Sequence, residues 1–134
     1  MNHGDHREHG ELLHADLSAA VISAAIEVHR ELGPGLLEGA YEACLVHELN
    51  AKGLQTKRQV SLPIHYKGLE LENGFRVDLI VEDKLLIELK ACDALSSVHD
   101  AQVLTYLKLT GIRVGLLFNF NATSIRKGMR RLVR

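Results

Sequence analysis

Two short segments that alternate aliphatic and charged residues, 76–81 and 85–90, constrain the fold of this 134-residue chain more than any other feature. Alternation of this kind predicts β-strands with one buried face, here two antiparallel strands joined by the turn Glu82-Asp83-Lys84. In the register that buries all the aliphatic positions, Leu79 faces Ile87. A slip of one residue would bury the charged side chains instead and is strongly disfavoured. The aliphatic positions are Val77, Leu79, Val81, Leu85, Ile87 and Leu89.

The same register brings two carboxylates together on the other face. Asp78 lies opposite Glu88, and directly opposed residues have Cβ atoms about 4.5–5.5 Å apart. Lys90 follows on that face, and Arg76 lies beside it. Adjacent carboxylates raise each other's pKa, and a hard divalent cation such as Mg²⁺ or Mn²⁺ relieves the repulsion. The pattern is compatible with a metal site at which Lys90 assists an attacking water, although for the hairpin alone a solvated face with cross-strand charge pairs is the slightly better explanation.

The rest of the chain predicts helices around a small sheet. Apolar spacing of three to four residues predicts two helices before the hairpin, with stops at Gly33 and Gly53, and one helix after it that ends at Gly111. Turns are expected at Lys67-Gly68 and at 72–74, and the basic remainder is a short strand or helix. The predicted helices cover 16–32, 34–52 and 97–109, and the predicted strands lie near 60–64, 75–81, 85–91 and 112–120.

This order predicts an α/β fold of α+β-like character, in which helices flank a mixed β-sheet. We expect one domain over residues 13–134, preceded by a disordered polar tail at 1–12. No apolar run is long enough to cross a bilayer. Cys44 and Cys92 match no metal or redox spacing, so we expect free thiols and a cytoplasmic protein.

Charge is distributed unevenly although the net charge is only −1. Asp100 is the last acidic residue, and all seven charged residues after it are basic. Such a basic end suits contact with nucleic-acid phosphates, but a solvated basic tail accounts for it equally well.

Three motifs extend the reading of the hairpin. Asp78 followed, after nine residues, by Glu88-Leu89-Lys90 resembles the core signature of the PD-(D/E)xK nuclease superfamily. Gln102 and Tyr106 resemble the Gln-x-x-x-Tyr motif of its exonuclease-like branch, and they share one helix face. Residues 35–41 match Gly-x-x-Glu-x-x-Tyr and so resemble the GxxExxY family of small proteins within that superfamily. The resemblance spans nearly the whole chain from Leu17, with Val77 in place of the namesake proline.

The resemblance implies a restriction-endonuclease-like core and a Mg²⁺ or Mn²⁺ site. It implies that Glu38 adds a third acid to the two direct metal ligands of the hairpin. The hairpin lysine would be the catalytic lysine, and the two motif residues of the last helix would support the site or hold substrate. The residues concerned are Glu38, Asp78, Glu88, Lys90, Gln102 and Tyr106.

Two further residues are candidates with a structural alternative beside the functional one. His99 lies on nearly the same helix face as Gln102, where it can support the site, contact phosphate or remain a surface histidine. Tyr41 can contact substrate, but a tyrosine on an apolar helical stripe more often packs in the core. His29 is expected to pack or cap near the end of the first helix.

The sequence therefore favours a metal-dependent phosphodiesterase of nuclease type that acts on nucleic acid, with DNA preferred. The alternative is a non-catalytic nucleic-acid-binding or adaptor module that keeps the nuclease fold. A homodimer is a further possibility, because many small nuclease domains need a second copy to reach both strands.

Overall fold

Eight elements make up the computed structural model, which describes residues 13–134; the segment for which a tail was predicted lies outside that range. The helices flank a mixed sheet, so the predicted fold class is confirmed. In chain order the elements are α2 (Ala15–Leu32), α3 (Glu38–Ala51), β1 (Thr56–Tyr66), β2 (Leu69–Val81), β3 (Leu85–Lys90), α4 (Ser97–Thr110), β4 (Val114–Asn119) and β5 (Met129–Val133).

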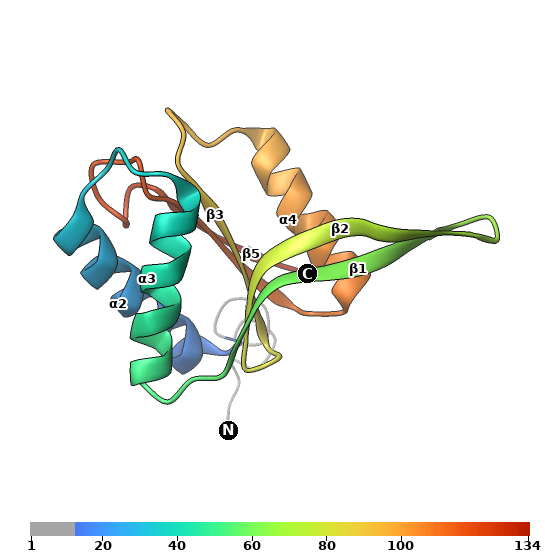
Figure 1. Cartoon of the computed structure of the whole chain (residues 1–134), viewed down its shortest axis with the longest axis horizontal. Helices are drawn as coiled ribbons and strands as arrows, with labels where there is room; N and C mark the ends of the chain where they lie inside the picture. The colour runs from blue at the N-terminus through green and yellow to red at the C-terminus, as the bar shows by residue number, and fades with distance from the viewer. Residues whose placement is uncertain (1–12) are drawn as a thin grey trace, which may run out of the picture.

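The five strands form one sheet in the order β1-β2-β3-β4-β5, and only β3 and β4 run parallel. Helices α2 and α3 cover one face of the sheet and α4 covers the other (Figure 1). Each face therefore has its own apolar core. Leu79 and Ile87 belong to the core under α2 and α3, whereas Ile80 and Leu86 pack beneath α4.

The predicted hairpin register is confirmed, since Leu79 pairs with Ile87 and Val81 with Leu85. One expected consequence is wrong: Val77 packs in the α4 core and not with Leu79. Alternation is interrupted at Asp78, where the β1–β2 ladder lacks one rung between regular pairs on either side.

The β1–β2 hairpin is longer than the sequence indicates and extends as an arm beyond the rest of the sheet (Figure 1). The turn at Lys67-Gly68 is confirmed, but the turn predicted at 72–74 is wrong. That segment stays within β2 as an irregularity opposite Pro63, where the register shifts. Gly74 is required there, because a Cβ would lie 2.6 Å from Ile64 Cγ1.

Helix α3 begins four residues later than predicted. Pro34 belongs to a loop, and the left-handed backbone of Gly33 (φ 67°) and Gly35 (φ 103°) turns the chain between the two helices. The Tyr41 hydroxyl donates to the Gly33 carbonyl oxygen (2.6 Å) and accepts from the Leu36 N–H (3.1 Å). These bonds hold the loop out of the helix.

Some of the basic side chains in the C-terminal stretch make contacts within the fold. Its central part forms β5, whose Arg131 donates to Ser18 Oγ (2.8 Å) and to the Leu13 carbonyl oxygen (2.6 Å). Arg130 pairs with Asp100 at 2.5 Å. These two arginines anchor β5 to α2 and α4, so the expected phosphate-binding end cannot use all of its charge.

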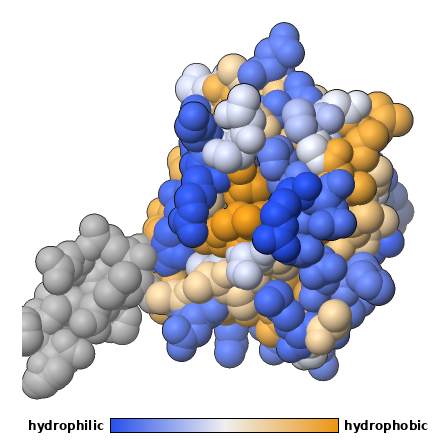
Figure 2. All heavy atoms as spheres, turned by 90° about the vertical axis from the view of Figure 1, so that its left-hand side faces the viewer, coloured by the Kyte–Doolittle hydropathy of each residue, from blue (hydrophilic) through white to orange (hydrophobic). Residues whose placement is uncertain are grey.

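The outer side of α2 and α3 mixes hydrophobic and hydrophilic surface (Figure 2). Between the helices lies a hollow of about 260 Å³ whose apolar lining includes Val28 and Leu32, with Glu27 and Glu31 among its other residues. No helix within residues 13–134 combines the length and apolar character needed to cross a membrane.

Helix α4 lies close to the sheet because β4 carries a glycine under it. A Cβ at Gly115 would lie 2.8 Å from Val103 Cγ1, and Val103 is fully buried. We expect Gly115→Ala to lower the free energy of unfolding by about 1–3 kcal/mol, because a well-packed interior resists added volume. Urea denaturation measures the change.

Two controls sharpen that measurement. Gly39→Ala meets no atom within 4 Å and should leave stability unchanged or raised by less than about 1 kcal/mol. In a Val103→Ala background the cost of Gly115→Ala should shrink. An equal cost in both backgrounds would contradict close packing of α4 on β4.

Candidate active site

The two hairpin carboxylates lie where β2 and β3 separate. The ladder ends at the pair Leu79–Ile87, and beyond it the side chains take over the bonding. The Asp78 N–H donates to Glu88 Oε1 (2.9 Å), and the Leu89 N–H donates to Asp78 Oδ2 (2.9 Å). Each acid therefore accepts a backbone hydrogen from the other strand, which fixes both carboxylates between the strands.

Glu88 is an acid in an unfavourable place for a charge. It is only 3% exposed, and its pKa is raised to about 8, first by burial and then by the negative charge of Asp78. The Asp78 N–H and the positive charge of Lys90 act in the opposite direction but do not compensate. Near neutral pH the positive charge of Lys90 is therefore too small to keep both Asp78 and Glu88 ionised.

A hard divalent cation fits this donor set. Mg²⁺ and Mn²⁺ prefer oxygen ligands, and Mg²⁺ often uses one or two carboxylates together with water and phosphate oxygens. Within residues 13–134 no group of three His, Cys, Asp or Glu side chains is arranged to hold a metal. Asp78 and Glu88 would therefore be the two protein ligands, with the remaining positions left to other oxygens.

The third predicted acid is not joined to this pair. Glu38 is the exposed first residue of α3 and has no hydrogen bond or ion pair to Asp78 or Glu88. It does lie one helical turn before Glu42, on the same face of the helix. That face is directed toward β1, as the contacts of Glu42 show.

Lys90 ends β3 two residues beyond Glu88. Its side chain is half-buried, and its ammonium makes no ion pair with any residue of the described chain. The backbone beyond it is fixed by Asn119, whose amide accepts from the Cys92 N–H (3.1 Å) and donates to the Cys92 carbonyl oxygen (2.9 Å). Lys90 thus presents an unpaired positive charge at the end of a firmly held strand.

The two motif residues of helix α4 bond to each other, and Tyr106 interacts electrostatically with the carboxylates. Gln102 Nε2 donates to the Tyr106 hydroxyl at 3.0 Å. The pKa of Tyr106 is raised by burial and next by the charge of Glu88, with a smaller contribution from Asp78. The phenol therefore lies within electrostatic reach of both acids, and its ring packs on Phe75 with centroids 5.1 Å apart.

The remaining candidates have structural contacts. His99 Nδ1 accepts from the Ser96 N–H (3.0 Å) at the start of α4, which commits one ring nitrogen to capping the helix. Tyr41 is fully buried and stacks on Phe120 with centroids 4.6 Å apart. His29 bonds the Ala122 carbonyl oxygen through Nε2 (2.8 Å), in keeping with the expected packing role.

Two residues at the site were missed by the sequence reading. Glu42 on α3 is 5% exposed and accepts from Arg58 Nε (3.0 Å) and Gln59 Nε2 (2.5 Å). Gln59 on β1 also donates to Asp78 Oδ1 (3.3 Å). The available signal was the four-residue spacing from Glu38 to Glu42, which puts both acids on one helix face.

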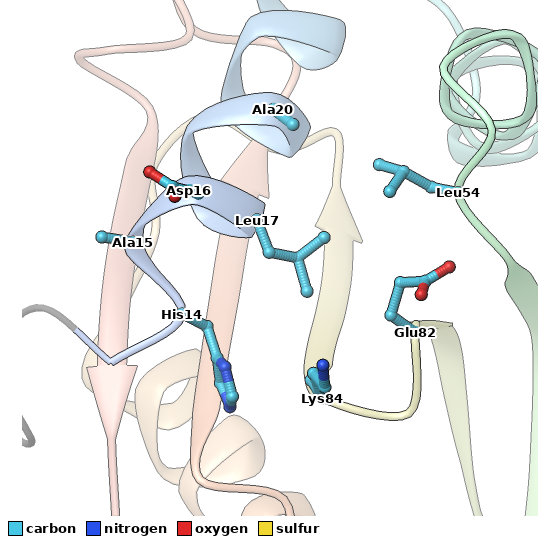
Figure 3. Close-up of a pocket in the computed structure, with 8 residues that line it drawn as sticks. All are labelled: His14, Ala15, Asp16, Leu17, Ala20, Leu54, Glu82 and Lys84. Carbon is cyan, nitrogen blue, oxygen red and sulfur yellow. The ribbon is translucent and has the colours of Figure 1, made fainter.

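The hollow shown in Figure 3 is remote from these acids. It is lined by His14 and Leu17 of the α2 region and by Glu82 and Lys84 of the hairpin turn. The turn precedes β3, whereas Glu88 and Lys90 lie near the other end of that strand. The hollow is not part of the carboxylate site.

The pKa of Glu88 makes stability depend on pH. The folded state holds the proton more tightly than the unfolded state, so metal-free protein should lose stability as pH rises from about 4.5 to about 8. Glu88→Gln removes this effect. We expect the variant to match the wild type at pH 5 and to exceed it by about 2–3 kcal/mol at pH 8.5.

Urea unfolding in the presence of a chelator, repeated between pH 5 and 9, measures this difference. Asp83→Asn, at an exposed turn position, serves as the control and should show no such trend. A difference between Glu88→Gln and wild type that stays constant with pH would show that Glu88 is not the titrating group.

Comparison with known proteins gives one match. A family model described as the PD-(D/E)XK nuclease superfamily matches residues 15–132. No curated protein and no solved structure matches the chain. The matched range includes both helices of one face, the carboxylate hairpin and α4. The chain therefore belongs to the PD-(D/E)XK nuclease superfamily.

Proposed function

We propose that this chain is a metal-dependent phosphodiesterase that hydrolyses nucleic acid, and we name DNA as the first substrate to test. One observation carries the proposal: Asp78 and Glu88 each accept a hydrogen bond from the backbone of the opposite strand, and the ammonium of Lys90, on the strand of Glu88, makes no ion pair within residues 13–134. We further assign the chain to the GxxExxY family, on Gly35, Glu38 and Tyr41.

The chemistry divides between the cation and the protein. Asp78 and Glu88 would hold a divalent ion, which would supply positive charge to the phosphate and make a water more acidic. Lys90 orients the attacking water or stabilises charge on a phosphate oxygen. Glu38, on the face of α3 that is directed toward β1, adds a further negative charge to the metal site without being one of its two direct ligands. Gln102 and Tyr106 support the site from α4.

Basic residues whose side chains make no hydrogen bond or ion pair within residues 13–134 support a nucleic-acid substrate. Arg126 and Lys127 are exposed in the segment between β4 and β5, and Lys108 is exposed on α4. They remain available to phosphates although Arg130 and Arg131 are used within the fold. Binding through such residues weakens with salt.

The proposal is tested by incubating the pure protein with single- and double-stranded DNA and RNA in Mg²⁺ or Mn²⁺. We expect cleavage of at least one substrate, and loss of about 100-fold or more in rate for Asp78→Asn and for Lys90→Ala. Asp83→Asn, at the opposite end of the hairpin, should cleave as the wild type does.

Failure to cleave any substrate, or equal cleavage by Asp78→Asn, would overturn the assignment. Salt-sensitive binding of DNA without cleavage and without measurable Mn²⁺ binding would instead identify a non-catalytic binding module. Light scattering with and without DNA tests the homodimer, which predicts twice the mass of one chain.

A further inference from the structure

We propose that Glu42 and Gln59 are positioning residues that hold the Asp78 carboxylate in its metal-binding orientation. This inference rests on the proposed function, because it assigns a role to residues that touch the metal ligand and not the substrate. The contacts run from Glu42 on α3 to Gln59 on β1, and from Gln59 to Oδ1 of Asp78 on β2.

The first link is a buried carboxylate with defined partners. Glu42 accepts from Arg58 Nε through Oε2 and from Gln59 Nε2 through Oε1. A carboxylate this deeply buried is stable only when hydrogen-bonded, preferably to a positive group. Arg58 supplies the charge, and its side chain remains about half exposed. The Glu42 carboxylate is therefore a fixed acceptor beside β1.

That acceptor decides which way the Gln59 amide points. An ionised carboxylate can only accept hydrogen bonds, so the NH₂ end of Gln59 must face Glu42. The two hydrogens of the same nitrogen serve Glu42 and Asp78 Oδ1. If the amide turned over, its oxygen would face two carboxylates and be repelled. The Glu42 carboxylate thus helps to keep the Gln59 amide in the orientation that donates to Asp78.

Both oxygens of Asp78 are then held from different strands. Oδ1 accepts from Gln59 on β1, and Oδ2 accepts from the Leu89 N–H on β3. Rotation of the carboxylate would break one of these bonds. Partners of this kind orient the ligands of metal sites and commonly change metal affinity by about 10–100-fold when removed.

The backbone at Gln59 departs from strand geometry at this point. Its φ of 50° is in the left-handed region, which is unfavourable for residues other than glycine. The β1–β2 ladder keeps the same register on both sides, at Arg58–Leu79 and Val60–Val77, and omits only the rung between Gln59 and Asp78. The left-handed backbone of Gln59 is energetically unfavourable, yet it does not shift the register of the strands. Such a conformation is expected where the position of the side chain has a function.

The test compares Gln59→Met, which keeps the length of the side chain but removes its donor, and Glu42→Gln with the wild type. Glu48→Gln is the control, since Glu48 lies on the same helix and makes no side-chain hydrogen bond within the described chain. Two quantities are measured: Mn²⁺ affinity by calorimetry, and exchange of the Leu89 amide hydrogen by NMR in metal-free protein.

We expect Gln59→Met to weaken Mn²⁺ binding about 10-fold and to speed exchange at Leu89, because Asp78 is freer to rotate away. Glu42→Gln should have a smaller effect in the same direction, since Asp78 is then the only carboxylate of the two that still orients the Gln59 amide. Both should keep the wild-type melting temperature within a few degrees, and Glu48→Gln should match the wild type throughout.

Wild-type Mn²⁺ affinity and Leu89 exchange in Gln59→Met would overturn the inference. If the wild-type protein itself binds no Mn²⁺, the proposed function fails, and the positioning role is decided by exchange alone. Faster exchange at Leu89 in both variants then supports it, and unchanged exchange overturns it.

Discussion

The site depends on two hydrogen bonds across the hairpin, from the Asp78 N–H to the Glu88 carboxylate and from the Leu89 N–H to the Asp78 carboxylate. Where two strands diverge, their N–H groups lose their usual acceptors, and a buried N–H without an acceptor is costly. Here the two carboxylates take that role and are oriented by doing so. The same two bonds satisfy the backbone N–H groups and fix the pair of acids, and they keep Glu88 buried although burial and the charge of Asp78 raise its pKa.

Much of the fold could be predicted because its determinants are local. Alternation of Leu79 and Ile87 with charged neighbours set the hairpin register, and Gly111 marked the end of α4 in a left-handed conformation. The wrong predictions concern segments whose conformation is set by contacts with other parts of the chain. Pro34 suits a helix start, yet the Tyr41 hydroxyl holds that loop open. Residues 72–74 have turn composition, but β1 continues to pair around them.

The relative placement of the candidate residues could be predicted, but the contacts that support them could not. Strand parity predicts that Asp78, Glu88 and Lys90 share a face, and helix periodicity predicts the same of Gln102 and Tyr106, whereas their proposed roles come from the resemblance of the motifs. The path through Glu42 and Gln59 depends on the approach of α3 to β1 and on one left-handed residue, neither of which has a pattern in sequence. The same irregularity explains why Val77 left the face that alternation assigns to it.

The attachment of β5 to α2 has a consequence for the order in which the chain assembles. The bonds that fix the acids join residues 10 and 11 positions apart, whereas Arg131 reaches back 113 and 118 positions to Ser18 and Leu13. Closing a long loop costs more entropy than closing a short one, so contacts between distant segments form more slowly. During synthesis on a ribosome the acidic hairpin can therefore pair early, while the first helix receives its arginine clamp only after β5 has emerged. The carboxylate pair is thus held by contacts of short sequence separation, and β5 is attached to the first helix by contacts of long separation.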